Sequence, residues 1–216
     1  MNRKALIPTL SYISKHESNR ETAIHEAGHA TAIYLGNKQR QLPDIVFQIV
    51  INRKSVPYST SLLRRSHHEW IAKIEGGRLI HALPSFKHFT AAQKYDYRDA
   101  FEADIVNLLV GPLAEAKYVA LRDDEPISPR LIPPQALHHY GGTSDLELVR
   151  EYLECFITDE AERADKIAEL FLMAFNFINN PVNWAAIVAL ADYILRVDKD
   201  RIDCEEAGFI ITQQHL

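Results

Sequence analysis

The chain has 216 residues, of which 47% are hydrophobic and 25% charged, enough for one substantial core or two small ones and with no sign of disorder. A net charge of -5 argues against a general affinity for nucleic acid or for anionic membranes. The longest uninterrupted apolar run, Trp184 to Ala191, is far shorter than the roughly 20 residues that span a bilayer, so we expect no membrane span.

The cysteines and the N-terminal residues indicate the compartment. Cys155 and Cys204 are far apart and form no C-x-x-C pair, which favours neither a disulfide framework nor a thiolate zinc site. The apolar stretch near the N-terminus is interrupted by Pro8 and is too short for a secretory signal. We therefore expect a cytoplasmic protein.

The first expected element after a mixed lead-in is a helix from about residue 19 to residue 35. Ser18 and Glu21 have capping-box spacing, which predicts a helix start just before Glu21. Gly36 with Asn37 provides a stop at the C-terminal end.

This helix carries an H-E-x-x-H motif, within the stretch T-A-I-H-E-A-G-H-A. Residues four apart on a helix differ by only about 40° around the axis, so His25 and His29 present two imidazoles to one point. Zinc takes about four such ligands, and a catalytic site leaves one position for water. Glu26 lies beside that position, where a carboxylate can act as the general base of a hydrolase.

The alternative interpretation is an ordinary amphipathic helix, whose two histidines are buried and hydrogen-bonded or exposed and idle. Gly28 favours the metal site. Glycine in a helix interior costs about 1 kcal/mol relative to alanine, and it is best explained where another segment passes close to the backbone.

A small sheet is expected next, within residues 44–83. The run from Asp44 to Asn52 is dense in Ile, Val and Phe and predicts a strand. A second strand is expected from Gly77 to Leu83. The residues from Arg53 to Glu75 between them have no regular pattern, and we interpret their basic cluster as a solvated loop.

The remainder, from about 97 to 211, is expected to be helical. Apolar spacing predicts a helix over about 97–121 that Gly111-Pro112 kinks or splits, followed by a proline-rich surface loop. Four further helices are expected, the last short: one beginning near Ser144, one over about 160–178, one capped by Asn180 and running to about 197, and one starting at Asp203.

The third zinc ligand must come from later in the chain, because His29 is not followed by a further helix-borne histidine. Two carboxylates stand out, Glu115 in the helix after Pro112 and Asp145 after the double glycine. A carboxylate in the first turn of a helix is favoured by the helix dipole, and the glycine pair permits a sharp approach to another helix. We predict that Asp145 is the ligand and that Glu115 orients a histidine.

Three stretches together resemble the FtsH-type zinc metalloproteases, in the family order. They are T-A-I-H-E-A-G-H-A, then I-V-N-L-L-V-G-P-L-A-E-A from Ile105, then G-G-T-S-D-L-E-L-V from Gly141. The resemblance implies a mainly α single domain with a small β-sheet, similar to the FtsH peptidase domain. It also implies that His25, His29 and Asp145 bind zinc and that Glu26 is the general base.

The chain departs from that family in two respects. The second motif normally reads Gly-Arg-Ala-Ala-Glu, whereas Pro112 and Leu113 replace two of those positions here. The sequence also has no Gly-Lys phosphate loop and no membrane helix, so it resembles the peptidase part alone.

The leading hypothesis is therefore a zinc metalloendopeptidase that hydrolyses peptides or unfolded proteins without its own ATPase. One alternative is a catalytically silent FtsH-peptidase-like binding or scaffold protein, and another is a hydrolase of a non-peptide amide. The expected partner is a peptide or unfolded protein substrate. A homo-oligomer or a separate ATPase partner stays open.

Overall fold

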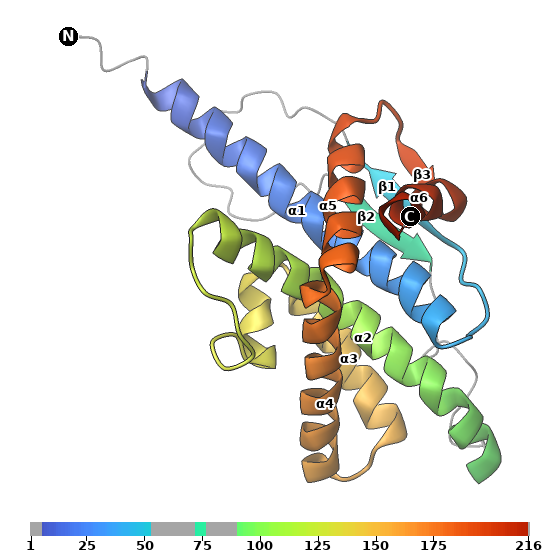
Figure 1. The fold of residues 1–216 in the computed structure, drawn as a ribbon. Coiled ribbons are helices and arrows are strands. Elements are labelled where there is room, and N and C mark those ends of the chain that lie inside the picture. The colour runs from blue at the N-terminus through green and yellow to red at the C-terminus, as the bar shows by residue number, and fades with distance from the viewer. Residues whose placement is uncertain (1–5, 53–71, 77–89, 216) are drawn as a thin grey trace.

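The computed structural model describes residues 6–52, 72–76 and 90–215. This part of the chain is mainly helical and contains one small antiparallel sheet (Figure 1). The helices are α1 (Leu6–Gln39), α2 (Ala91–Arg122), α3 (Thr143–Phe156), α4 (Glu160–Asn179), α5 (Pro181–Arg196) and α6 (Cys204–Thr212), with two 3-10 helices, η3 (Pro134–His139) and η4 (Gln213–His215). The strands are β1 (Phe47–Ile51), β2 (Ala72–Gly76) and β3 (Arg201–Asp203).

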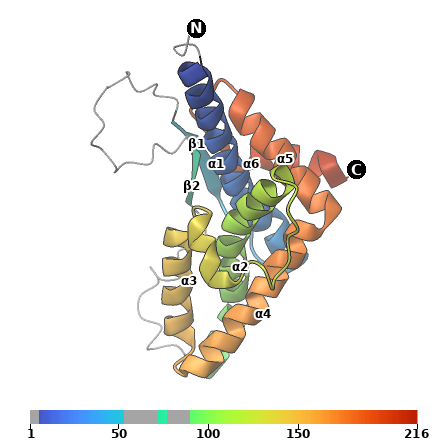
Figure 2. The ribbon, with the colours of Figure 1, turned by 90° about the vertical axis from the view of Figure 1, so that its left-hand side faces the viewer.

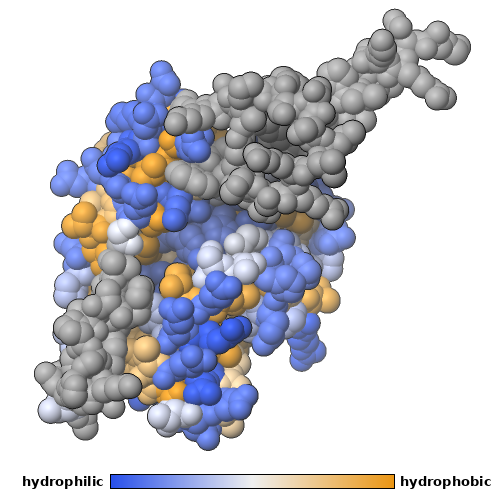
Figure 3. All heavy atoms as spheres, turned by 180° about the vertical axis from the view of Figure 1, so that it is seen from behind, coloured by the Kyte–Doolittle hydropathy of each residue, from blue (hydrophilic) through white to orange (hydrophobic). Residues whose placement is uncertain are grey.

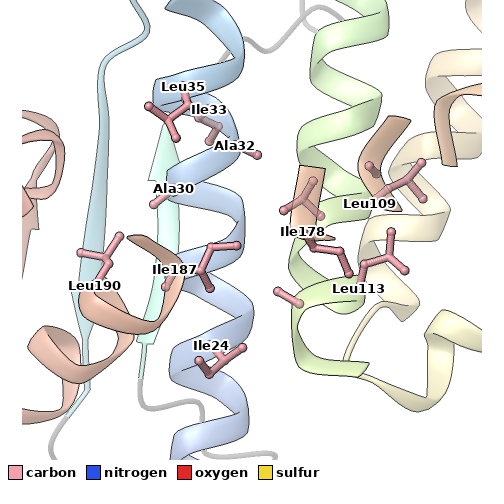
Figure 4. Packing of buried hydrophobic residues seen from close by; sticks show 14 of the residues in the cluster. Ile24, Ala30, Ala32, Ile33, Leu35, Leu109, Leu113, Ile178, Ile187 and Leu190 are labelled. Carbon is pink, nitrogen blue, oxygen red and sulfur yellow. The ribbon is translucent and has the colours of Figure 1, made fainter. Parts of the chain in front are cut away.

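Two long helices, α1 and α2, lie side by side and run in opposite directions (Figures 1 and 2). Helix α5 packs on α1, and α4 packs on α2. Figure 4 shows Ile187 of α5 beside α1, and Ile178 of α4 beside Leu109 and Leu113 of α2. All of these side chains are buried, so the α1–α5 pair and the α2–α4 pair share one apolar core.

Small residues allow the backbones of α1 and α2 to come close together. A Cβ atom on Gly28 would lie 3.0 Å from the Cβ atom of Ala114 and 3.2 Å from the Cα atom of Gly111. This is the close backbone approach that the glycine in the motif predicts, and α2 is the segment that makes it. Any larger side chain at residue 28 would push the two helices apart.

The sheet has the order β2-β1-β3, with both pairs antiparallel. Ile49 at the centre of β1 stands opposite Ile74 of β2 on one side and Ile202 of β3 on the other. Strand β2 is thus an outer strand, and it lies against α1. Within the described residues, the sheet therefore brings its outer strand to the helix that carries the H-E-x-x-H motif.

The two long helices differ from the sequence-based expectation. Helix α1 begins at Leu6 rather than near residue 19, and Ser18 lies inside it, so the capping-box prediction was wrong. Pro8 is compatible with this start because the N–H groups of a first turn have no helical partner. Helix α2 is not split at Gly111-Pro112, since a proline removes one helical hydrogen bond and the buried packing around Pro112 offsets that loss.

The sheet also differs in part. Strand β1 lies within the predicted run from Asp44 to Asn52, but it is the central strand and not an edge. The predicted strand from Gly77 to Leu83 and the whole basic cluster, within residues 53–68, lie outside the described residues. The observed partner is β2, within a stretch expected to be irregular, and β3 lies beyond the predicted 44–83 range.

The later helices begin where the sequence predicts. Asn180 caps α5, its Oδ1 atom accepting hydrogen bonds from the N–H groups of Val182 (2.9 Å) and Asn183 (3.3 Å). Asp203 caps α6 in the same way, accepting from the N–H group of Glu206 at 2.8 Å. These contacts form within one helical turn, which is why the sequence pattern is sufficient to predict them.

Within the described ranges, no helix is long and apolar enough to cross a membrane. On the face opposite to that of Figure 1, hydrophobic side chains are interspersed with hydrophilic ones (Figure 3).

The contact between α1 and α2 leads to a stability prediction. We expect Gly28→Ala to lower the free energy of unfolding by about 1–3 kcal/mol, because the added methyl group must displace α2. Gly36→Ala is the matched control on the same helix, since its Cβ atom would meet only Oδ1 of Asn107, at 3.6 Å. That variant should be neutral or more stable by up to about 1 kcal/mol. Urea unfolding of both variants checks this, and equal destabilisation would contradict it.

Candidate metal centre

Two histidines of α1 and one aspartate of α3 converge in the interior. His25 and His29 lie one turn apart, with exposed fractions of 7% and 8%, and Asp145 in the first turn of α3 is 9% exposed. Nε2 of His25 lies 3.4 Å from Oδ2 of Asp145, and Nε2 of His29 lies 3.4 Å from Oδ1. The three candidate ligand atoms all lie within 4.8 Å of one another.

The other nitrogen of each imidazole is held by α2. Nδ1 of His29 lies 2.8 Å from the carbonyl oxygen of Asn107, which can only accept, so this nitrogen carries a proton and donates it. Nδ1 of His25 lies 2.9 Å from Oε2 of Glu115 and donates to that carboxylate. Both rings are thereby oriented with Nε2 toward Asp145, and a neutral imidazole in this tautomer has its lone pair there.

The spacing of these atoms suits a tetrahedral metal better than direct hydrogen bonds. Charge-assisted N–H to carboxylate bonds are usually about 2.7–2.9 Å long, shorter than the two 3.4 Å distances observed. Zinc bonds of about 2.1 Å at tetrahedral angles separate two ligand atoms by about 3.4 Å, a distance that each imidazole nitrogen has to a different oxygen of Asp145. Two imidazole nitrogens and one carboxylate oxygen form a ligand set that zinc uses. One ligand atom from each of the three residues lies within 4.8 Å of the other two, so the group could hold a zinc ion.

Two glycines leave room for this arrangement. A Cβ atom on Gly111 would lie 2.3 Å from Nε2 of His29, so a side chain on α2 at this point would occupy the space of the imidazole. Gly141 has a φ of +70° and lies against the His25–Glu115 pair. That left-handed conformation favours glycine and lets the chain turn sharply into α3, which carries Asp145.

The charges of the site are strongly coupled. Burial alone lowers the pKa of His25, but the hydrogen bonds with Asp145 and Glu115 and the charge of Asp145 raise that pKa to about 10. Burial also lowers the pKa of His29, but the charge of Asp145 and the hydrogen bond with it outweigh burial and raise that pKa. Burial raises the pKa of Asp145, yet the two histidines hold it well below its usual range. Positive charge between these three residues is therefore favoured, whether protons or a metal ion provide it.

Glu26 directly follows His25 in α1 and lies beside the three candidate ligands. Its Oε2 atom accepts a hydrogen bond of 2.8 Å from the backbone N–H of Ile74 in β2. Glu26 and the three candidate ligands line a cavity of about 380 Å³, within the range of small-ligand pockets. Strand β2 and helices α2 and α3 form the other walls through, among others, Lys73, Ile74, Leu108, Leu148 and Tyr152.

The structure brings together all four residues that the sequence singled out, His25, Glu26, His29 and Asp145, and it places Glu115 against His25. It adds two backbone groups that sequence reasoning missed, the carbonyl of Asn107 and the amide of Ile74. Every residue carries such groups, so no side-chain pattern could have identified them. Gly111 was visible in the sequence as a residue that leaves space beside its backbone, but the sequence interpretation used it only as a helix breaker.

Comparisons of the chain with protein-family models, with curated proteins and with solved structures find no match. The residues and geometry of this chain therefore carry the functional argument.

The ligand assignment is tested by metal content. We expect Asp145→Ala to lose zinc, because it removes one of the three converging groups. Glu115→Ala should keep zinc with affinity weaker by about 10- to 100-fold, since Glu115 contacts only Nδ1 of His25. Zinc stoichiometry and affinity of the purified variants decide whether Asp145 or Glu115 is the third ligand. Loss of metal in Glu115→Ala with retention in Asp145→Ala would reverse the assignment.

The raised histidine pKa values predict proton release on metal binding. At pH 7.5 the metal-free protein holds a proton on His25, whose pKa is about 10, and the pKa of His29 is raised as well. Metal ligation needs neutral imidazoles, so zinc uptake should release about one to two protons. Calorimetry in two buffers of different ionisation enthalpy measures this number. Glu115→Ala, which should keep zinc, should release fewer protons because it removes a hydrogen bond that raises the pKa of His25. A heat independent of the buffer in the wild-type protein would contradict the prediction.

Proposed function

We propose that the protein is a zinc-dependent metallopeptidase that hydrolyses peptides or unfolded proteins. The observation that carries this proposal is the convergence of His25, His29 and Asp145 with the carboxylate of Glu26 beside them, in one cavity. A buried pair of histidines without function would need neither a third ligand nor an adjacent carboxylate.

Each residue has a defined part in the proposed reaction. A zinc ion held by the three ligands would polarise the carbonyl of the scissile peptide and make a water molecule acidic. Glu26 takes a proton from that water and passes it to the leaving amine. Glu115 and the carbonyl of Asn107 keep both imidazoles in the tautomer that ligation requires.

We also propose that the domain is of the FtsH peptidase type. The three stretches that resemble that family lie far apart in the sequence but meet at one place in the fold. The first supplies the two histidines and Glu26, the second supplies Asn107 and Glu115, and the third supplies Asp145. This meeting supports the proposal, because it gives each stretch a part in the same centre.

The outer edge of β2 is the proposed place for the substrate backbone. Lys73, Ile74 and Gly76 line the cavity beside Glu26, so an extended peptide along this strand would pass the metal position. The N–H of Ile74 already donates to Glu26, so the peptide would pair through the remaining backbone groups of this edge. Main-chain pairing accepts many sequences at similar free energy, which suits a peptidase of broad specificity. Free cysteines at residues 155 and 204 agree with the cytoplasmic location that we propose.

Glu26→Gln tests the catalytic role. The amide keeps the size of the side chain and can still accept from Ile74, but it cannot take a proton from water. We expect zinc stoichiometry to be unchanged and kcat on an unstructured protein substrate to fall by about 10²–10⁴-fold. The chelator-treated wild-type protein is the control that removes the metal but keeps the base.

An inactive wild-type protein would overturn the peptidase proposal. If zinc-loaded protein cleaves no peptide or unfolded substrate, and Glu26→Gln behaves identically, the binding or scaffold function replaces it. If non-peptide amides are cleaved and peptides are not, the reaction class stands and the substrate class is wrong.

The proposed binding mode predicts selectivity for unfolded substrates. Pairing with β2 requires an extended backbone, and unfolding a stable domain costs about 5–15 kcal/mol. A small disulfide-bonded protein should therefore resist cleavage in its native state and be cut after reduction and alkylation. Gel assays with and without ATP measure this, and ATP should change neither rate. Equal cleavage of the native and alkylated forms would contradict the prediction.

A further inference from the structure

Within the described residues, one backbone group of the sheet forms a hydrogen bond with the H-E-x-x-H motif. This group is the amide of Ile74. Its N–H donates to Oε2 of Glu26 at 2.8 Å, and the bond is partly buried. Ile74 lies 48 residues from Glu26 in the sequence, so the contact depends on how β2 is placed against α1.

The alternation of the antiparallel ladder explains why this amide is free to face α1. The N–H of Ile51 in β1 donates to the carbonyl of Asp200 on the β3 side, at 2.8 Å. Backbone groups alternate with a period of two, so Ile49 also faces β3 while Val50 faces β2. Ile74 stands opposite Ile49, and its N–H therefore points away from β1, toward the outer edge.

We infer that the backbone amide of Ile74 positions the general base, by holding Oε2 of Glu26 so that Oε1 remains to accept the proton. This inference rests on the proposed function. Ile74 itself does not exchange protons with the substrate, so it is a positioning residue and acts only through Glu26.

Positioning matters here because of the freedom of a glutamate side chain. Glu26 is partly exposed at the cavity wall and has three rotatable bonds. General-base catalysis requires the carboxylate within about 2.6–3.2 Å of the proton that it removes. A fixed N–H at 2.8 Å limits the orientations of the carboxylate before the substrate arrives, which lowers the entropy lost in reaching the reactive geometry.

The direct test replaces the backbone amide of residue 74 by an ester, which removes the N–H and keeps the side chain. The matched control is the same replacement at Val50, whose N–H faces β2 and takes part only in the β1–β2 ladder. Each change removes one backbone N–H from the same sheet. Only the change at residue 74 removes the hydrogen bond to Glu26, whereas the change at residue 50 removes a bond of the β1–β2 ladder. Ile74→Pro is a second, simpler variant, because an outer strand tolerates proline where the N–H faces away from the sheet.

We expect the ester at residue 74 to lower kcat by about 10- to 100-fold, a part of the 10²–10⁴-fold that a general base contributes. kcat is measured at saturating substrate, because β2 is also the proposed place of the substrate backbone and KM is therefore not a clean readout. Zinc affinity should stay the same, because zinc binding does not depend on the orientation of Glu26. The ester at residue 50 should lower Tm to a similar extent and leave kcat unchanged. Ile74→Pro should repeat the effect of the ester at residue 74.

Hydrogen exchange gives a second readout that does not depend on activity. In Glu26→Ala the amide of Ile74 loses its acceptor and should exchange at least about tenfold faster, whereas the amide of Val50 should not change.

Three results would overturn the inference. An unchanged kcat in the ester at residue 74, or an equal fall in the ester at residue 50, shows that Ile74 only supports the sheet. Unchanged exchange of the Ile74 amide in Glu26→Ala shows that the hydrogen bond is not formed. A zinc-loaded wild-type protein without any hydrolytic activity rejects the proposed function and the positioning role together, while the exchange result still decides whether the bond exists.

Discussion

The close approach of α1 and α2 at Gly28 and Gly111 is the constraint on which the candidate metal centre depends. Because residues 28 and 111 have no side chains, the two backbones come close and the imidazole of His29 lies directly over Gly111. At this distance a main-chain carbonyl of α2 reaches Nδ1 of His29 and the Glu115 side chain reaches Nδ1 of His25. A wider separation would leave both imidazoles free to rotate, and their Nε2 atoms would no longer share one target.

The second constraint is the cost of burying charge. His25, His29 and Asp145 are almost fully buried, and the carboxylate of Glu115 contacts the first of them. Buried carboxylates are unfavourable unless positive charge compensates them. Protons on the histidines provide that charge in the metal-free protein, as the raised pKa of His25 indicates. A divalent cation that binds only the folded state would provide it as well and would add its binding free energy to folding.

The sheet serves the centre although it is small. Strands of three to five residues would not be stable alone, but β1 is paired on both sides and packs with the helices in one core. Strand β3 and α6 come from the C-terminal part of the chain and contact β1, while the outer strand β2 pairs with β1 and lies against α1. The fold thereby fixes the outer strand of the described sheet beside Glu26, whose carboxylate accepts a hydrogen bond from the Ile74 amide.

The sequence by itself determined the features that form within one or two helical turns. The shared direction of His25 and His29 and the caps at Asn180 and Asp203 depend on local spacing, which the amino-acid order shows directly. Only the tertiary structure decided which distant groups complete the centre. The carbonyl of Asn107 lies 78 residues from His29, and the amide of Ile74 lies 48 residues from Glu26. Backbone groups are chemically the same at every residue apart from proline, so their roles come from the packing of helices and the register of strands.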